Sequence, residues 1–241
     1  MKKIDLHDSL KIVVKIMKTI ALDVETTGLP KKMKASINDS SNWPYVVQIS
    51  WVVLNDNNVI EKICDYIIKA PIVIPQESIN IHGITNEKMN KEGVEIGAIL
   101  AEFMNDYNHS DIIIAHNLNF DKTMVEVELY RNRMFPDINK LKYNSIINCC
   151  TMKTGKDICK IIKISKFGKE YYKFPKLSEL YEHLFNKTPT NLHNSLVDIL
   201  VCLRCFYKMR FSEDLLEKST TFKEIFNQNT SHNHPAASAQ L

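Results

Sequence analysis

Acidic residues recur along this chain at spacings that could bring their carboxylates together. Asp23 and Glu25 lie two residues apart at the end of the apolar run at 20–22, and residues i and i+2 of an extended strand face the same side. Asp121 ends the sequence A-H-N-L-N-F-D, and Asp198 ends H-N-S-L-V-D. Carboxylate oxygens are the ligands that Mg²⁺ prefers. Convergence of these four side chains would create a site for divalent cations, which can activate water for hydrolysis.

A tight turn follows the first acidic pair directly. Its residues are Thr26, Thr27, Gly28, Leu29 and Pro30, and the apolar side chain of Leu29 is expected at the tip. An acidic pair at a strand end is usually solvated, but a turn of this kind beside the pair favours a binding site.

Three motifs, D-V-E-T-T-G, H-N-x-x-F-D and H-x-x-x-x-D, occur in this order between about Lys18 and Met209. With them the chain resembles the DEDDh 3′-to-5′ exonucleases, the DnaQ-like family that includes the proofreading exonucleases of bacterial replicative polymerases. A tyrosine nearer the last aspartate would mark the sister DEDDy group, and this sequence does not have it. The resemblance implies that two Mg²⁺ or Mn²⁺ ions are held by Asp23, Glu25, Asp121 and Asp198, and that His193 is the general base.

The mechanism that we expect depends on charge. A phosphodiester is an anion, and two cations about 4 Å apart can both lower the pKa of a bound water and stabilise the leaving 3′ oxygen. We expect Asp23 to be shared between the ions, with Glu25 and Asp198 on the water-bearing ion and Asp121 acting partly through water. An imidazole, with an ordinary pKa of ~6.5, lets His193 accept a proton near neutral pH.

A second group of residues is predicted to hold the end of the substrate. The sequence I-H-G-I-T at 81–85 resembles the motif with which these exonucleases hold the terminal nucleotide. Glycine in both turns lets backbone N–H groups approach a sugar or base, and Leu29 is predicted to wedge against the terminal base, with Ile81 and Ile84 on its other side. The alternative is an ordinary turn with a core isoleucine pair. The predicted nucleic-acid-binding set is Thr26, Thr27, Gly28, Leu29, Ile81, His82, Gly83, Ile84 and Asn117, the last expected to hydrogen-bond locally and hold Asp121.

Composition limits the classes of protein to consider. The formal net charge of the 241 residues is only +3, so any basic nucleic-acid footprint must be local. Lysine clusters occur at 31–34 and 153–169, and we interpret each as solvated surface. Six cysteines fit neither a disulfide scaffold nor a zinc ribbon, and Cys202 and Cys205 are predicted to be core thiols. With no secretory signal and no apolar stretch near ~20 residues, we expect an intracellular protein of the cytoplasm or nucleus, not secreted and without a membrane partner.

The pattern of elements predicts an α/β fold, an RNase H-like mixed sheet with helices on both faces. β-branched runs predict strands at 18–24, 46–54, 59–69, 111–115 and 146–150. Apolar periodicity predicts helices at 94–107, 119–134, 176–186, 192–209 and 213–227, with Asn191 as a candidate N-cap. A small hairpin is predicted at 160–173, turning at Gly168. We expect an N-terminal extension at 1–17, an exonuclease domain at 18–210, and a C-terminal helix with a mobile tail at 211–241, the tail starting near Asn227.

The predicted activity is metal-dependent hydrolysis from the 3′ end of DNA, releasing nucleoside 5′-monophosphates, with single-stranded or mismatched ends preferred, in proofreading or repair. Contacts to sugar and phosphate carry little sequence information, so broad sequence tolerance is expected. The expected partners are nucleic acid 3′ ends, DNA rather than RNA, and a polymerase or replication protein is a candidate. Three alternatives stay open: trimming of RNA ends, a module that binds a 3′ end without cutting, and metal storage. Unused clustered acids would cost stability, which disfavours the binding module.

Overall fold

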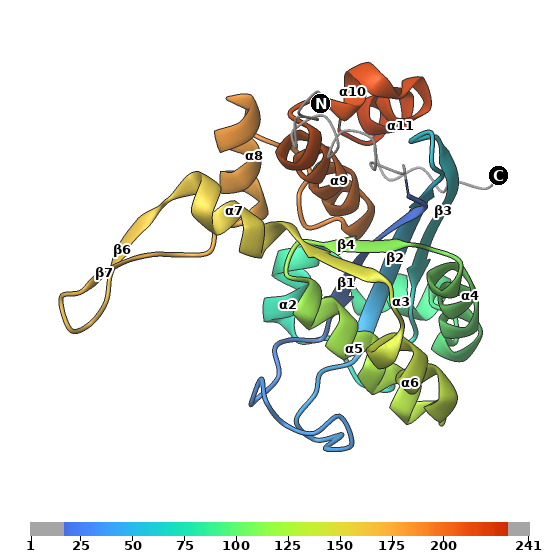
Figure 1. Cartoon of the computed structure of the whole chain (residues 1–241). Coiled ribbons are helices and arrows are strands. Elements are labelled where there is room, and N and C mark those ends of the chain that lie inside the picture. The colour runs from blue at the N-terminus through green and yellow to red at the C-terminus, as the bar shows by residue number, and fades with distance from the viewer. Residues whose placement is uncertain (1–16, 231–241) are drawn as a thin grey trace, which may run out of the picture.

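A five-stranded mixed sheet runs through the molecule in the order β3-β2-β1-β4-β5 (Figure 1). The computed structural model describes residues 17–230, so the predictions for residues 1–16 and for 231–241 lie outside the described residues. β1 pairs antiparallel with β2 and parallel with β4, β2 is antiparallel to β3, and β4 is parallel to β5. The strands are β1 (Thr19–Thr26), β2 (Val46–Leu54), β3 (Ile60–Ile67), β4 (Ile112–Ala115) and β5 (Ile147–Cys150).

Alternation along β1 divides its side chains between two apolar cores. Ile20, Leu22 and Val24 pack into a core with the helices of one face, whereas Ala21 packs into a second core with the helices of the other. The first face carries α4 (Ile96–Asn108), α5 (Leu118–Arg131) and α6 (Phe135–Tyr143), and the second carries α8 (Leu177–Phe185), α9 (Ser195–Phe211), α10 (Leu215–Lys218) and α11 (Thr220–Thr230). The predicted RNase H-like sheet with helices on both faces is confirmed.

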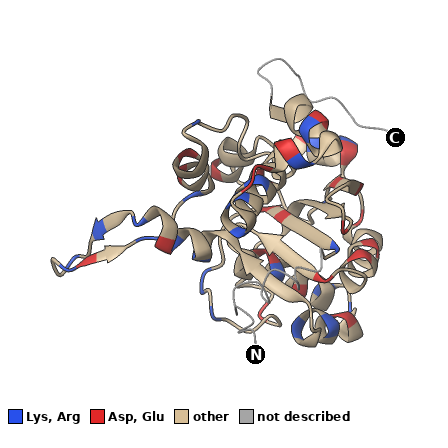
Figure 2. Cartoon of the chain, turned by 45° about the horizontal axis from the view of Figure 1, so that its top comes forward, with Lys and Arg blue, Asp and Glu red and all other residues tan. Residues whose placement is uncertain are grey.

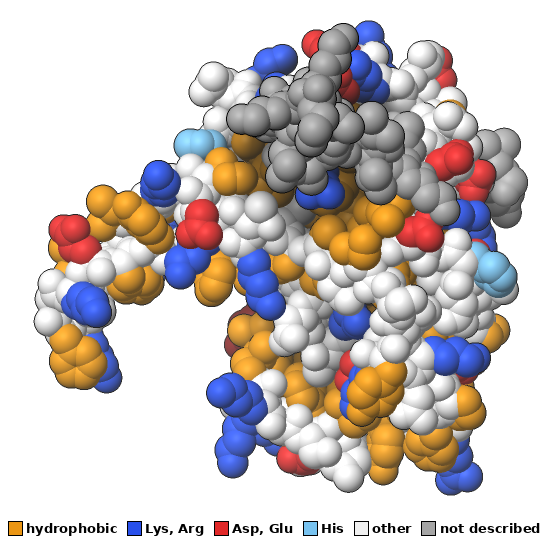
Figure 3. Space-filling model, in the orientation of Figure 1, with side chains coloured by type: hydrophobic (Ala, Val, Ile, Leu, Met, Phe, Trp, Pro, Cys, Tyr) orange, Lys and Arg blue, Asp and Glu red, His pale blue; other side chains and the backbone are white. Residues whose placement is uncertain are grey.

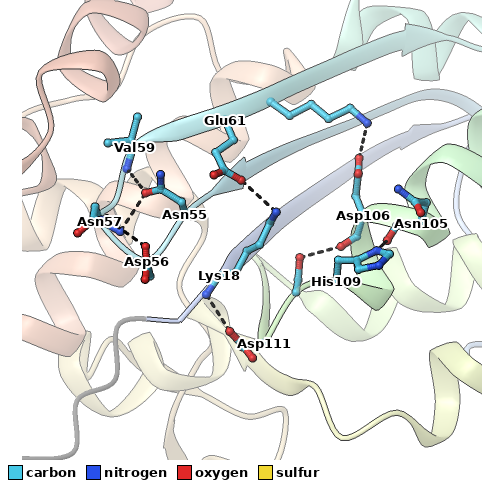
Figure 4. A network of polar contacts seen from close by, with 12 residues as sticks. Lys18, Asn55, Asp56, Asn57, Val59, Glu61, Asn105, Asp106, His109 and Asp111 are labelled. Carbon is cyan, nitrogen blue, oxygen red and sulfur yellow. Dashed lines mark hydrogen bonds and ion pairs between the residues drawn. The ribbon is translucent and has the colours of Figure 1, made fainter.

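Polar contacts fix the end of the sheet that lies opposite the acidic pair (Figure 4). The backbone N–H of Lys18 donates to the Asp111 carboxylate at 2.9 Å, and its ammonium group pairs with Glu61 at 3.0 Å. A turn at 55–58 joins β2 and β3, with Asn58 in the left-handed region at φ 60°. Lys18 therefore connects the start of β1 to β3 and to the residue before β4. These contacts fix the register of the central strand at the end opposite the acidic residues.

Several helices differ from the sequence predictions. The helix predicted to reach Met134 ends at Arg131, because Arg133 adopts a positive φ of 59°, and α6 starts two residues later with a proline in its first turn. The helix predicted at 213–227 is two helices separated by Ser219, whose φ of −136° is extended. The second of these continues to Thr230, so the chain beyond Asn227 is still helical. Within residues 17–230, four helices were not predicted: α6, α2 (Gln76–His82), α3 (Asn86–Glu92) and α7 (Thr151–Cys159).

A separate hairpin projects from the body between α7 and α8 (Figure 1). It consists of β6 (Ile162–Ile164) and β7 (Glu170–Tyr172), which pair only with each other. The predicted turn at Gly168 is confirmed by its φ of 76°. Cys202 and Cys205 are free thiols buried in α9, as predicted. Among residues 17–230, no helix combines the length and the apolar character that crossing a membrane requires.

Candidate active site

Three carboxylates converge where β1 reaches its carboxyl end. Asp23 and Glu25 share the face of β1 on which Ala21 packs against α9, and Asp198 lies in the first turn of that helix. One oxygen from each of the three lies within 4.8 Å of the others. The Ser195 hydroxyl donates to the backbone carbonyl of Asp23 at 3.1 Å and so fixes the start of α9 against the strand. The period-two prediction for Asp23 and Glu25 is therefore confirmed, and α9 supplies the third carboxylate.

Asp121 approaches from the other face of the sheet. It is 3% exposed, in the first turn of α5, and is not among the three carboxylates that lie within 4.8 Å of one another. Asn117 precedes this helix in the left-handed region at φ 80° and its carbonyl accepts the Phe120 N–H at 2.8 Å. Its side chain makes no cap hydrogen bond. Asn117 therefore hydrogen-bonds locally through its backbone carbonyl and not through its side chain, and its left-handed conformation turns the chain into the helix that carries Asp121.

Burial disfavours ionisation of all four carboxyl groups, and neighbouring negative charge adds to this effect for Glu25, Asp121 and Asp198. Burial raises the pKa of Asp23 to about 6. Burial, with the charges of Asp23 and Asp198, raises the pKa of Glu25 to about 9. Burial and the charge of Asp23 raise the pKa of Asp198 to about 8, and the same two causes raise the pKa of Asp121. Such a cluster can be fully ionised at neutral pH only if positive charge lies among its oxygens.

Two oxygens of the cluster have no hydrogen-bond donor among the described residues. Asp23 Oδ2 and Asp121 Oδ2 are both buried and both lack a partner. A buried, unsatisfied carboxylate oxygen is costly. An all-carboxylate set of this kind suits Mg²⁺ or Mn²⁺ rather than a softer ion. The donor set and its unpaired oxygens therefore fit divalent cations.

His193 lies just ahead of α9 and not within it. The residue is exposed with a φ of 70°, and its backbone N–H lies 3.3 Å from both carboxylate oxygens of Asp198. The predicted N-cap at Asn191 is wrong, because the side chain of Asn194 caps the helix by accepting the Val197 N–H at 3.3 Å. Two left-handed residues, Asn191 and His193, delay the helix until 195. As a result the imidazole sits on a loop that is hydrogen-bonded to a candidate metal ligand.

The turn after β1 is built as a rigid support for an exposed tip. Thr27 is buried, and its backbone N–H and hydroxyl both bond the backbone of Tyr45, at 2.9 and 3.0 Å. The Thr26 hydroxyl donates to the Gly28 carbonyl at 2.7 Å. Gly28 has a φ of 150°, and a Cβ there would meet only the Ser78 hydroxyl of α2, 4.0 Å away. Leu29 is 83% exposed, as predicted for the tip.

The I-H-G-I-T sequence contains the end of α2 and the start of the next turn. Gly83 ends the helix in the left-handed region at φ 72°, and His82 Nδ1 accepts the Ile84 N–H at 3.1 Å. Ile81 is 58% exposed, whereas Ile84 is 2% exposed in a small core with Val47, Ile74 and Met89. The prediction that Ile84 contacts the terminal base is wrong, because the reversal at Gly83 turns it inward. Of the two isoleucines, only Ile81 remains exposed, on the helix whose Ser78 faces Gly28.

His116 lies in the turn after β4, and its partners could not be identified from the sequence. Its Nδ1 lies 2.9 Å from the Thr151 hydroxyl and its Nε2 lies 3.1 Å from the Pro175 carbonyl. Burial lowers the pKa of His116 to about 4, so it is neutral at physiological pH. Ser195 was missed as well, although it lies inside the H-N-S-L-V-D sequence. Both residues position the site rather than form it.

The fold and the carboxylate cluster together define a hydrolytic nuclease of RNase H-like architecture. Residues 20–206 match the family RNase_T, described as "Exonuclease". The chain therefore belongs to this exonuclease family, which is the DnaQ-like 3′-to-5′ group that the motifs indicate. No curated protein matches the chain in sequence.

Solved structures of exonuclease I share the fold. E. coli exonuclease I in complex with a dA16 oligonucleotide matches with a TM-score of 0.57 and 15% identity over 87% of this chain and 43% of that one. The zinc-bound E. coli exonuclease I–ssDNA complex matches with a TM-score of 0.59 and 16% identity over 87% and 43%. The moderately thermophilic exonuclease I of Methylocaldum szegediense gives 0.58 and 14% over 83% and 42%. This chain thus spans less than half the length of these relatives.

Proposed function

We propose that this chain is a metal-dependent 3′-to-5′ exonuclease that removes nucleoside 5′-monophosphates from single-stranded or frayed DNA ends. The observation that carries the proposal is the convergence of Asp23, Glu25 and Asp198 within 4.8 Å beside the unpaired Asp121 oxygen. DNA is favoured over RNA because the fold is shared with exonuclease I in complex with DNA oligonucleotides. A role in proofreading or repair, with a polymerase as a candidate partner, is the one that the family resemblance implies.

The residues have distinct roles in this proposal. Asp23, Glu25, Asp121 and Asp198 hold two Mg²⁺ or Mn²⁺ ions. When bound, these ions neutralise the phosphate, lower the pKa of water and stabilise the leaving oxygen. His193 accepts a proton from the attacking water and passes it to solvent, which its exposed loop allows. The backbone bonds from His193 to Asp198 keep the base within reach of the cluster.

The exposed turn positions the terminal nucleotide. Leu29 at the tip and Ile81 at the end of α2 present apolar surface on two elements that meet at Gly28 and Ser78. The backbone of Gly28 and of Gly83 carries no side chain that would keep a sugar or base at a distance. We assign Thr26, Thr27 and His82 to support of these turns, since each is engaged with the backbone around them.

The decisive experiment uses a 5′-labelled single strand, offered as DNA and as RNA of the same sequence, with Mg²⁺ and with EDTA. A ladder that shortens from the 3′ end of DNA only when Mg²⁺ is present is the expected result. Asp198→Asn is the matched control, since it removes one charge while keeping the shape of the side chain. If RNA is shortened faster than DNA, RNA is the substrate. If the strand is bound but not shortened, the chain is a non-catalytic module that binds a 3′ end.

A further inference from the structure

The β6–β7 hairpin contributes nothing to the core of the molecule. All six residues of its two strands are exposed, and Figure 3 shows it curving away from the body across a hollow. A lone two-stranded hairpin is marginally stable in water. Because the side chains of its strands do not pack in the core, they are free to bind a ligand. Their arrangement indicates what kind of ligand this is.

The register sorts the hairpin into two faces. Lys163 pairs with Tyr171 and Ile162 with Tyr172, and directly opposite residues project to the same face. Lys169 lies two residues before Tyr171 and therefore shares its face. We call Lys163, Lys169 and Tyr171 the cationic face. The opposite face, which we call the apolar face, holds Ile162, Ile164, Glu170 and Tyr172.

The positive charges of the hairpin are not neutralised within the protein. Among residues 17–230, neither lysine of the cationic face makes an ion pair, and the same is true of Lys166 at the tip. The Lys166 ammonium lies 5.1 Å from the ring centre of Phe167, which is 86% exposed. Lys173 differs, because its ammonium contacts Glu179 of α8 and so fastens the base of the hairpin. Figure 2 shows the recurrence of basic residues along the hairpin.

The base of the hairpin is fastened to the active site. His116, one residue before Asn117 at the start of α5, bonds both Thr151 at the start of α7 and Pro175 just after the hairpin. Gly155 lets α7 pack closely here, since a Cβ there would lie 3.0 Å from Leu180 and 3.1 Å from Pro175. The hairpin therefore projects from a fixed base beside the element that carries Asp121.

We propose that the cationic face and the tip of the β6–β7 hairpin bind the single strand on the 5′ side of the nucleotide held at the carboxylates. Lys163, Lys166 and Lys169 contact phosphates, and Tyr171 and Phe167 stack on bases. Unpaired lysines interleaved with exposed aromatic rings are the combination that holds single strands without reading their sequence. This inference rests on the proposed function, since the strand enters with its 3′ end in the site. It replaces the interpretation of these lysines as solvated surface.

The test measures binding in EDTA by the anisotropy of a 5′-labelled DNA single strand of about 20 nucleotides, longer than one such site. Lys163→Gln/Lys169→Gln should raise Kd about tenfold at low salt. The slope of log K against log salt should fall in magnitude by about 1.4, or about 0.7 for each phosphate that the variant no longer neutralises. Tyr171→Ala should raise Kd at least about fivefold with little change in slope, since stacking is not a counterion effect.

Three control variants and one short ligand separate the cationic face from general damage. Lys163→Arg/Lys169→Arg keeps the charge and should bind as the wild type does. Ile164→Thr changes the apolar face of the same strand while keeping a β-branched residue, and should leave Kd unchanged within about twofold. Lys187→Ala/Lys223→Ala removes two exposed lysines elsewhere and should leave the salt slope unchanged. A trinucleotide should bind all variants equally, because it is too short to reach the hairpin.

The outcomes distinguish this inference from the proposed function. Loss of affinity in the glutamine variant, with the arginine variant intact, supports the strand-binding face even if the chain fails to shorten DNA in Mg²⁺. A wild-type Kd and salt slope for the glutamine variant overturn the inference, even if the chain degrades DNA as proposed. An equal loss in Ile164→Thr would also overturn it, since both faces would then matter alike.

Discussion

At the scale of single residues, the carboxylate cluster is a set of charges that the folded chain cannot satisfy alone. Asp23 Oδ2 is buried without a donor, and Glu25 and Asp198 each feel the charge of Asp23. A cation would neutralise that charge and fill the unpaired position. Function and stability should therefore respond in opposite directions when one carboxylate is neutralised.

Asp198→Asn should lower the rate of DNA hydrolysis by more than about a hundredfold, since even outer partners of metal ligands cost 10–100-fold. In EDTA the same variant should melt higher by at least about 2 °C, the shift that ~1 kcal/mol produces in a chain of this size. Thermal melts with and without Mg²⁺, beside a gel assay, check both. Turnover of DNA by Asp198→Asn at the wild-type rate in Mg²⁺ would contradict the two-metal proposal.

His193→Ala should separate chemistry from binding. We expect a rate reduced by about a hundredfold, the usual value of a positioned general base, with an unchanged Kd for a single strand in EDTA. The acidic limb of the pH–rate profile should disappear with the imidazole. Persistence of that limb in the variant would mean that another group accepts the proton. Neighbouring Asn194→Ala is a useful comparison, because it removes only the helix cap.

At the scale of elements, sequence reasoning succeeded where periodicity was long and failed where elements were short. The strands and the helices α4, α8 and α9 were predicted within a few residues. The helices α2 and α3 have seven residues each, too few for a periodic signal, and α7 contains Gly155 in its interior. The error at Ile84 has another origin: a glycine turn in the I-H-G-I-T motif was recognised, but not the direction in which the left-handed conformation of Gly83 sends the chain.

The exposed position of Leu29 at the tip of the turn predicts a difference between duplex and single-stranded substrates. Leu29→Ala should slow degradation of blunt duplex more than that of single strands, because only a paired end needs a wedge. Opening one terminal pair costs roughly 1.4 kcal/mol, so wild type should favour single strands about tenfold. Parallel time courses on the two substrates measure the ratio. Equal slowing on duplex and single strand would show that Leu29 packs the turn and does not open the paired end.

Ile84→Ala supplies the contrasting case. Because Ile84 is buried with Val47 and Met89, its truncation should cost about 2–5 kcal/mol of unfolding free energy and leave the preference for single strands unchanged. Chemical denaturation together with the two-substrate assay tests this. A normal denaturation midpoint combined with an altered preference would restore Ile84 to the nucleotide site.

At the scale of the whole molecule, the raised carboxyl pKa values tie stability to pH. An unfolded chain ionises Glu25 and Asp198 near pH 4, whereas the metal-free folded protein holds their protons up to about pH 9 and 8. Over this interval the folded state binds more protons, so stability must fall as pH rises. We expect the melting temperature in EDTA to decrease from pH 5 to pH 9, and saturating Mg²⁺ to remove most of that decrease.

Asp198→Asn should flatten the same curve without metal, because one of the titrating groups is gone. Binding of Mg²⁺ at pH 7 should also release protons, which calorimetry in buffers of different ionisation enthalpy detects. Identical metal-free melting temperatures at pH 5 and pH 9 would contradict the clustering of these carboxylates. The four candidate ligands were identified from motifs, but the burial that raises their pKa values could not be seen in the sequence.

The pairing of β1 with β4 stops at Ala21, while β1 continues to Thr26 against β2 alone. From this point the chain leaves β1 toward β2 and leaves β4 toward β5, so the sheet parts between two parallel neighbours. In open α/β sheets, ligands bind at such a switch point, outside the carboxyl ends of the strands. The order in which the strands are connected therefore accounts for the place of the carboxylate cluster in the sheet. If the β6–β7 hairpin holds the strand as proposed above, changes in the hairpin would alter how the substrate is held without moving the carboxylate cluster.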